Sequence, residues 1–343
     1  MKVGNIEAKP GEHAFGYLEV AKSRSGLGPD IPVHIFAGAE PGPTLLLQGA
    51  IHGGEIIGSV AILNLIGKLD PKKFRVTVIS VPVMNRVGFE LGERGIRIGS
   101  TDISRLFPGS ATGSVPAQIA NTYFEEVIKR ADVMIDFHAG ARTGYERYVL
   151  FGAEKDPDNP TELDQKRRKL VVAFGLDQAA FVPVDTFGTN TPRALLHKLL
   201  CLITLEFGGG TGWYKNGKDN VSDAERGIWN IMKSMRMMEG DFESDGPLCT
   251  VYNAGIVIWK GDVDGLFIRQ RRFGDEMKEG DVYASLVDAY TGETIDTMVA
   301  PEDGIVIPSG KEWPTIGATS VGILGNIDRV EDRRTADMYV DFD

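Results

Sequence analysis

The sequence has few of the features that indicate secretion or membrane insertion. Its 343 residues include only two cysteines, Cys201 and Cys249, which lie far apart and indicate no disulfide framework. It contains no run of eighteen apolar residues, and no apolar segment follows the first five residues. We therefore expect a cytoplasmic protein that does not insert into a membrane.

The chain also lacks an excess of positive charge, because its 48 acidic residues outnumber its 37 basic ones. The formal net charge is −11, and basic residues occur only in short clusters such as residues 269–272. This balance argues against nucleic acid as a partner. No Gly-x-Gly-x-x-Gly follows a predicted strand, which argues against a dinucleotide-dependent dehydrogenase, and the missing Gly-x-Ser-x-Gly argues against a serine hydrolase.

The length and a change of texture along the chain predict two domains. A chain of 343 residues can bury a large core. Residues 56–69 have helical apolar spacing and lie between the apolar stretches 44–47 and 74–82, an order typical of a parallel α/β unit. From residue 248 onward, short β-like stretches alternate with turns and predict an all-β module. We place the domains at 1–247 and 248–343.

Three segments outside this pattern have their own predictions. Residues 13–38 alternate apolar and polar side chains around glycine and proline, which indicates a hairpin at a sheet edge. Residues 84–109 are rich in glycine and charge, and residues 139–165 are rich in Asp, Pro and Gly. Both predict long loops, and long loops in compact domains tend to be functional.

A candidate metal site begins with His52 and Glu55. They lie between the predicted strand at 44–47 and the predicted helix at 56–69, in the kind of turn where α/β sheets place their sites. An imidazole and a carboxylate three positions apart can bind the same divalent ion. The pattern is short and common, so a tight turn with a core histidine and a solvated glutamate is the alternative.

His138 is the third candidate ligand. It ends the apolar stretch 133–138 and precedes a glycine closely, so its imidazole is expected at the same edge of the sheet. The other histidines, His13, His34 and His197, lie in a predicted hairpin, strand and helix, and we interpret them as structural. Two histidines and a glutamate form a ligand set of zinc hydrolases that leaves a position open for water.

Glu206 is a candidate catalytic carboxylate. It closes the apolar stretch 201–205 and is followed, after one phenylalanine, by three glycines. An acid in this position indicates more than solvated surface. A buried glutamate that faces a helix terminus is the structural alternative.

The order and spacing of these motifs resemble the succinylglutamate desuccinylase/aspartoacylase family, relatives of zinc carboxypeptidases. The resemblance covers most of the chain and rests on Asn85 and residues 41–47, 52–55, 102–109, 136–140, 204–209 and 300–304. It implies an α/β fold in which helices flank a mixed sheet of the zinc-carboxypeptidase type. It also implies that the C-terminal β module partly covers the active site.

By this resemblance, His52, Glu55 and His138 hold one Zn²⁺ per chain. Glu206 is then the general base that activates the zinc-bound water and passes its proton to the leaving amine. This assignment agrees with the chemistry, because zinc lowers the pKa of bound water and polarises a carbonyl, and a nearby carboxylate completes the proton transfer.

The resemblance also assigns roles to arginines. Arg97 corresponds to a residue that stabilises the developing oxyanion, with Arg94 as the alternative because nearby glycines make the loop register uncertain. Arg105 corresponds to the arginine that binds the α-carboxylate of the substrate. Arg193 resembles an arginine that meets a second substrate carboxylate in some members, and a solvated helix residue is its alternative.

Ser104 is a departure from the family pattern. The usual motif is Asp-Leu-Asn-Arg, whereas this chain has Asp102-Ile103-Ser104-Arg105. A serine hydroxyl offers less than an asparagine amide, which has a separate donor and acceptor. We therefore expect Ser104 to lie in the substrate site and to bind the α-carboxylate of the substrate more weakly, or in a different direction, than an asparagine would.

These observations predict a zinc-dependent amidohydrolase that cleaves a small N-acyl amino acid or a related N-acyl amine. Two alternatives stay open: a carboxypeptidase-type peptidase that acts on short peptides, and a non-catalytic zinc-binding protein on the same scaffold. The acyl group, the amine, the native metal and the oligomeric state, a homo-oligomer included, are not determined by the sequence.

Overall fold

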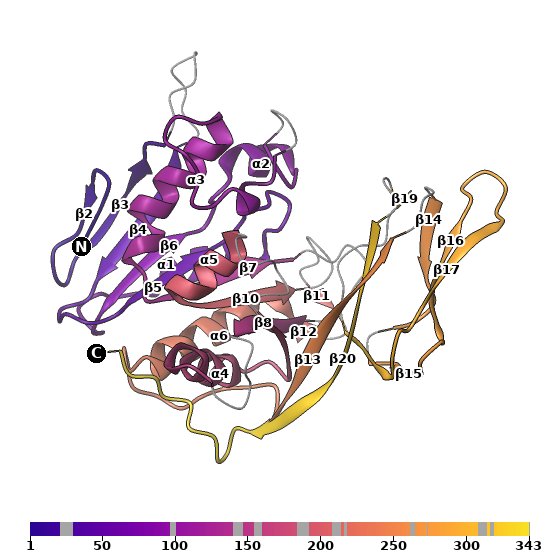
Figure 1. Cartoon of the computed structure of the whole chain (residues 1–343). Coiled ribbons are helices and arrows are strands. Elements are labelled where there is room, and N and C mark those ends of the chain that lie inside the picture. Colours follow the sequence, from indigo (N-terminus) through magenta and orange to yellow (C-terminus); the bar gives the residue numbers. More distant parts are fainter. Residues whose placement is uncertain are drawn as a thin grey trace.

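The computed structural model describes most of the chain, namely residues 1–20, 30–96, 101–139, 147–153, 160–183, 192–207, 214–215, 218–260, 265–272, 274–307, 314–315 and 319–342. Strands and helices alternate in the first two thirds, and strands alone follow in the described residues of the last third (Figure 1). The helices are α1 (Ile57–Ile66), α2 (Arg86–Leu91), α3 (Val115–Glu126), α4 (Glu162–Phe174), α5 (Pro192–Leu199) and α6 (Asn220–Ser234), with 3-10 turns η1 (Ile103–Arg105) and η2 (Ile128–Arg130).

One mixed sheet runs through most of the molecule. Its strands in spatial order are β15 (Glu276–Met277), β18 (Gly304–Ile307), β20 (Thr319–Asp332), β13 (Leu248–Lys260), β9 (Gln178–Pro183), β8 (Arg147–Ala153), β10 (Cys201–Phe207), β7 (Val133–His138), β5 (Thr44–Gln48), β6 (Thr77–Val81), β4 (Ile31–Ala37) and β3 (His13–Leu18). The central pairs β10–β7, β7–β5 and β5–β6 are parallel, so these strands end at the same edge.

Helices cover both faces of the central strands, which confirms the predicted α/β class. Leu45 and Leu47 of β5 contribute to a core with α1, α4 and α6, whereas Leu46 packs on the opposite face with α3. All five residues of β5 are buried, which explains its nearly continuous apolar sequence. The first α/β part is thus a three-layer arrangement around the parallel strands.

Local sequence signals define several of these elements. The helix α4 begins with a capping box in which Thr161 and Asp164 satisfy each other's backbone N–H groups. The helix α2 lies inside the segment that the sequence predicts to be a loop, and its cap Asn85 accepts a hydrogen bond from the amide of Gly88. The predicted loop at 139–165 also contains a strand, β8, which is a correction to the sequence interpretation.

The C-terminal strands extend the large sheet and add a second one. The long strands β13 and β20 pair in antiparallel fashion from Leu248–Asp332 to Lys260–Thr319. A four-stranded sheet of β17 (Thr294–Val299), β16 (Val282–Val287), β14 (Gly265–Arg269) and β19 (Pro314–Thr315) packs with β15 and β18 around a separate apolar cluster. The remaining strands form two short hairpins, β1 (Lys2–Val3) with β2 (Ile6–Glu7) and β11 (Tyr214–Lys215) with β12 (Lys218–Asp219).

After β20 the chain returns to the α/β part. Met338 and Val340 are buried in the core beside α6, and the amide of Val340 donates to the carbonyl of Ser234 over 2.8 Å. Arg333 is 8% exposed and donates to carbonyls of residues on both sides of the junction at 248. The end of the chain therefore ties the C-terminal strands back to the α/β part.

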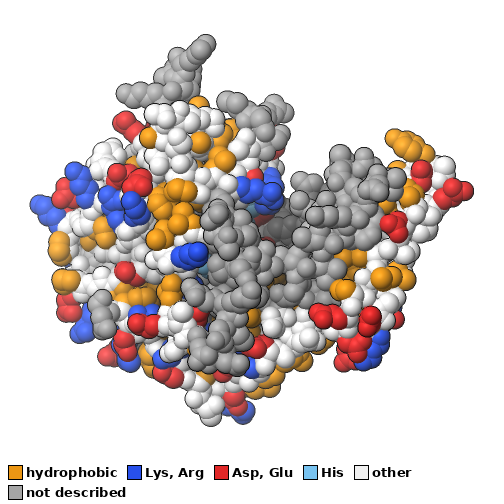
Figure 2. All heavy atoms as spheres, viewed as in Figure 1, with side chains coloured by type: hydrophobic (Ala, Val, Ile, Leu, Met, Phe, Trp, Pro, Cys, Tyr) orange, Lys and Arg blue, Asp and Glu red, His pale blue; other side chains and the backbone are white. Residues whose placement is uncertain are grey.

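The surface is mixed in charge on the face that Figure 2 shows, where acidic and basic side chains are interspersed. Among the described helices, none combines the length and the apolar character that a membrane span requires.

Candidate metal centre

The loop between β5 and α1 is held in place from the β6 side of the sheet. Asn85 donates through its backbone N–H to the carbonyl of Ala50 over 3.1 Å and through Nδ2 to the carbonyl of Ile51 over 3.2 Å. Gly53 allows α2 to approach, because a Cβ at this position would lie 1.9 Å from the carbonyl carbon of Gly88. These contacts fix the path of the backbone on both sides of His52.

The three predicted ligands lie together at the carboxyl edge of the sheet. Nδ1 of His52 is 3.1 Å from Oε1 of Glu55, and Nδ1 of His138 is 3.0 Å from Oε2 of Glu55 and 3.2 Å from Nδ1 of His52. The candidate ligand atoms all lie within 4.8 Å of one another. His52 and Glu55 are buried, and His138 is nearly so.

Each histidine is backed by an aspartate on its far side. Nε2 of His52 lies 3.2 Å from Oδ1 of Asp102, and Nε2 of His138 lies 2.9 Å from Oδ2 of Asp136. The other oxygen of Asp136 accepts a hydrogen bond from Gln48 over 2.6 Å. A carboxylate at Nε2 favours the proton on that nitrogen, so Nδ1 can bind a cation once it gives up the proton that it shares with Glu55.

The electrostatics favour carboxylates that stay ionised around the two imidazoles. Burial alone would raise the pKa of Glu55 and of Asp102. Hydrogen bonds from His138 and His52 to Glu55, and from His52 and Ser104 to Asp102, hold both pKa values well below the usual range instead. Burial would likewise lower the pKa of His138, but its carboxylate neighbours raise it well above its ordinary value.

This donor set fits a divalent zinc ion. Zinc accepts histidine nitrogen and carboxylate oxygen, and catalytic sites commonly combine three such ligands with an open position. Histidine ligands of metals almost always donate their second N–H to a carboxylate, a backbone carbonyl or water, as the aspartates allow here. The cluster His52, Glu55 and His138 can therefore hold a metal, with the excess negative charge of its surroundings favouring a cation.

Glu206 lies next to this cluster. Glu206 lies on β10, which pairs in parallel with β7, and its register partner on β7 is His138. Both side chains therefore project from the same face of the sheet. Adjacent strands are about 4.8 Å apart, which places the two residues side by side. Glu206 is partly buried, while the residues before and after it in β10 are buried.

Two of the predicted arginines converge on Asp102. Nε of Arg94 lies 3.1 Å from Oδ2 of Asp102, and its Nη1 lies 3.5 Å from Oε1 of Glu55. Nε of Arg105 lies 3.4 Å from the same Oδ2. Both guanidinium groups remain largely exposed, at 53% for Arg94 and 71% for Arg105, so each can also meet a solute.

The remaining predicted arginines are not placed by the structure. Arg97 lies outside the described residues. Arg193 belongs to α5, but its side chain is also outside the description. Ser104 is described, and its hydroxyl donates to Oδ1 of Asp102 over 2.6 Å.

The sequence does not predict a role in the site for Asp102 or Asp136, although both lie in segments that carry the family resemblance. A signal for Asp136 was present, because residues i and i+2 of a strand share a face and Asp136 precedes His138 by two positions. No comparable local signal marks Asp102, which is fifty residues from His52 in sequence.

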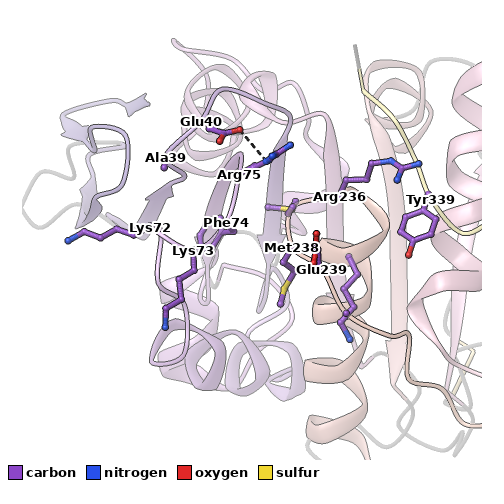
Figure 3. Close-up of a pocket in the computed structure, with 13 residues that line it drawn as sticks. Ala39, Glu40, Lys72, Lys73, Phe74, Arg75, Arg236, Met238, Glu239 and Tyr339 are labelled. Atoms are coloured by element: carbon purple, nitrogen blue, oxygen red, sulfur yellow. Dashed lines mark ion pairs between the residues drawn. The ribbon is translucent and has the colours of Figure 1, made fainter.

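A cavity of about 500 Å³ lies elsewhere, beyond the amino end of β6 (Figure 3). Most of its basic residues have partners. Arg75 pairs with Glu40 at 3.1 Å, Arg236 pairs with Asp341 at 2.7 Å, and Lys73 lies 3.7 Å from Asp70. Lys233 is mostly buried and donates to the carbonyl of Asp241. This cavity has none of the metal ligands, so we base the functional assignment on the cluster.

Comparison with known proteins identifies relatives along most of the chain. The family model described as succinylglutamate desuccinylase/aspartoacylase catalytic domain matches residues 41–235. The chain is 28% identical over 290 residues to N-alpha-acetyl-L-2,4-diaminobutyric acid deacetylase from Halomonas elongata. That match covers 83% of this chain and 82% of the relative.

Solved structures share the fold. The product-bound ectoine utilization protein EutE (DoeB) from Ruegeria pomeroyi is 24% identical and superposes with a TM-score of 0.77. The alignment covers 95% of this chain and all of that one. A succinylglutamate desuccinylase/aspartoacylase from Rhodobacter sphaeroides is 22% identical, with a TM-score of 0.74 and coverage of 93% and 95%. With the domain match over more than half of its length, the chain belongs to the succinylglutamate desuccinylase/aspartoacylase family.

Proposed function

We propose that this protein is a zinc-dependent deacylase that hydrolyses the amide bond of a small N-acyl amino acid or related N-acyl amine. The observation that carries the proposal is the cluster of three ligand atoms within 4.8 Å, with Glu206 on the adjacent strand. Family membership and the named activity of the Halomonas relative support the same reaction class. In this proposal residues 1–247 form the catalytic domain, and residues 248–343 partly cover its mouth.

Glu206 would perform the proton transfers. A bound zinc ion would polarise the acyl carbonyl and lower the pKa of water at the site. The carboxylate of Glu206 takes a proton from the attacking water and then delivers it to the amide nitrogen, which leaves as an amine. The second proton of the water passes from the new carboxylic acid to the amine, so the products are a carboxylate and an ammonium group, and no covalent intermediate with the protein is needed.

The arginines would bind the charged parts of the substrate. Arg94 borders Glu55 and is half exposed, so it can donate to the developing oxyanion, and Arg97 is the other candidate for this role. Arg105 would bind the α-carboxylate through its planar fork of donors, and Arg193 would bind a second carboxylate where the substrate has one.

The first experiment is amine release from a panel of N-acyl amino acids. The panel contains N-acetyl, N-succinyl and N-formyl compounds, with N-acetyl-2,4-diaminobutyrate included because of the Halomonas relative. Each compound is tested with a free and an amidated α-carboxylate, and short peptides are included. We expect turnover of one N-acyl class that chelation abolishes and zinc restores. Turnover of peptides alone would favour a carboxypeptidase-type activity instead.

Glu206→Gln separates catalysis from metal binding. We expect kcat to fall about 10²- to 10⁴-fold, the range of general acid–base catalysis, while the zinc content stays that of the wild type. The matched control is Glu302→Gln, because Glu302 is an exposed residue of a C-terminal turn and should leave both properties unchanged. Full zinc occupancy without turnover of any compound in the wild type would favour a non-catalytic zinc-binding protein.

A further inference from the structure

Asp102 is the meeting point of the metal cluster and the Asp-Ile-Ser-Arg motif. Its Oδ1 accepts hydrogen bonds from the amide of Ser104 over 3.0 Å and from the hydroxyl of Ser104 over 2.6 Å. The same oxygen lies 3.2 Å from Nε2 of His52. Ser104 is thus connected to a metal ligand through a single carboxylate.

The hydroxyl of Ser104 has one proton to donate. In this arrangement that proton is directed to Asp102, so it is not available to a substrate carboxylate, which can only accept. The guanidinium of Arg105, in contrast, is 71% exposed and retains donors beyond its contact with Asp102. Within the motif, the hydroxyl of Ser104 donates to the protein, whereas the guanidinium of Arg105 faces solvent.

We propose that Ser104 is a positioning residue for the metal site, which holds Asp102 so that His52 keeps Nδ1 directed at the metal. Ser104 stands where the family motif has asparagine, and the proposal gives this departure a function. It rests on the proposed zinc site and deepens it. Arg105 is then the residue of this motif that anchors the substrate.

Zinc affinity tests this role directly. The apoprotein is titrated with zinc against a chromogenic chelator for the wild type, Ser104→Ala, Ser104→Thr and Asp102→Asn. We expect the dissociation constant to rise about tenfold in Ser104→Ala and by up to about a hundredfold in Asp102→Asn, the range for residues that orient metal ligands. Ser104→Thr keeps the hydroxyl and should restore the wild-type value.

The control is Ser110→Ala, because Ser110 is an exposed serine of the same segment and should not change the dissociation constant. Cobalt-substituted protein provides a second readout, since its visible absorption reports ligand geometry and should change in Ser104→Ala but not in Ser104→Thr or Ser110→Ala. With zinc saturating, Ser104→Ala should keep the wild-type KM, whereas Arg105→Ala should raise it.

The results distinguish this inference from the proposed function. Unchanged zinc affinity and cobalt spectrum in Ser104→Ala would overturn the inference and leave the zinc deacylase intact. A raised KM in Ser104→Ala with unchanged zinc affinity would return Ser104 to substrate binding. No zinc binding by the wild type would overturn both.

Discussion

Two imidazoles lie in contact on the outer strands of the sheet, far from the metal cluster. Nε2 of His13 is 3.1 Å from Nδ1 of His34, and both rings stack on Phe36. Burial, and then the neighbouring His13, lower the pKa of His34 to about 4, and burial lowers the pKa of His13. Both histidines are therefore neutral in the folded protein at neutral pH, as a structural role requires.

This pair predicts a loss of stability in mild acid. In the unfolded chain His34 titrates near its ordinary pKa of 6.5, so between pH 6.5 and 4 the unfolded state binds more protons and stability falls as the pH falls. For this half-buried ring we expect a contribution on the order of 1 kcal/mol after allowance for solvent screening. His34→Phe should reduce the difference in denaturation midpoint between pH 7 and 4.5. Equal differences in the two proteins would contradict the prediction.

At the residue scale, the sequence predicts that the three candidate metal ligands lie together, but it does not predict the residues around them. His52 and His138 each follow an apolar strand, and parallel strands end at one edge, so their proximity could be inferred. The orientation of each ring depends on Asp102 and Asp136, and the distance from His52 to Asp102 is set by tertiary packing. The register of the loop that contains Arg94 has no periodic signal that would fix which arginine reaches the site.

The helix α1 packs unusually close to the strand that carries His138. A Cβ on Gly58 would lie 2.1 Å from Cβ and 2.4 Å from Cγ of Phe137. Phe137 is buried and immediately precedes His138 in β7. The packing of α1 on β7 therefore affects the distance between two candidate metal ligands, because Glu55 immediately precedes the N-cap of α1 and His138 ends β7.

We predict that Gly58→Ala destabilises the protein by about 1–3 kcal/mol, the usual cost of overpacking, and weakens zinc binding. Thermal denaturation and chelator competition measure the two effects. The control is Gly67→Ala at the end of the same helix, where the nearest atom to a new Cβ is 3.9 Å away and φ is −70°. Gly67→Ala should be neutral or slightly stabilising. A Gly58→Ala protein as stable as its control would refute the close packing.

At the element scale, the long, strongly patterned segments were predictable and the short ones were not. The strand β5 and the helix α1 have clear apolar periods, and both formed as expected. The helix α2 has only six residues. Its cap at Asn85 and the left-handed Gly92 at its end are helix signals, but the glycine and charge content of the segment favours a loop prediction over them. Polar, glycine-rich sequence flanks β8 on both sides, so the sequence predicts a loop where the structure has this strand.

Hydrogen bonds from Arg333 join the C-terminal strands to the α/β part. Arg333, after β20, donates through Nε to the carbonyl of Val172 over 3.0 Å and through Nη1 to the carbonyls of Gly246 and Leu248 over 2.8 Å each. Nη2 also donates to the carbonyl of Leu176. A single guanidinium thus connects the end of α4 with the start of β13.

We predict that Arg333→Met lowers the free energy of unfolding by about 2–4 kcal/mol, because it removes a donor from two buried carbonyls, those of Val172 and Leu176, and from two partly buried ones. The neighbouring Arg334→Met is the control, since Arg334 is 70% exposed and pairs with Asp332, and it should cost less than about 1 kcal/mol. Chemical denaturation of both variants measures the difference. Zinc affinity should be unchanged in both, and equal stabilities would show that Arg333 does not join the two parts.

At the scale of the whole molecule, the sequence predicted a β-rich C-terminal region but not how it is attached. The strand β13 pairs with β9 in parallel and with β20 in antiparallel fashion, so it belongs to the large sheet as well as to the region after residue 248. Strand pairing of this kind depends on which edge of the sheet is open to a further strand. Composition changes along the chain carry no information about that edge.

The paired strands β13 and β20 have a mechanical consequence. With thirteen and fourteen residues they form a ribbon about 40 Å long, which begins beside β9 in the large sheet and carries the C-terminal strands. Such a two-stranded ribbon cannot rotate about one flexible backbone bond as a hinge does. A change in its angle to the α/β part requires bending or twisting of a hydrogen-bonded ladder. The register shift between Val251 and Tyr252 lies within the stretch of β13 that pairs with β9, at the base of the ribbon, and bulges of this kind increase local twist. If residues 248–343 partly cover the candidate metal site, as in the proposed function, access to it would depend on the elasticity of two strands.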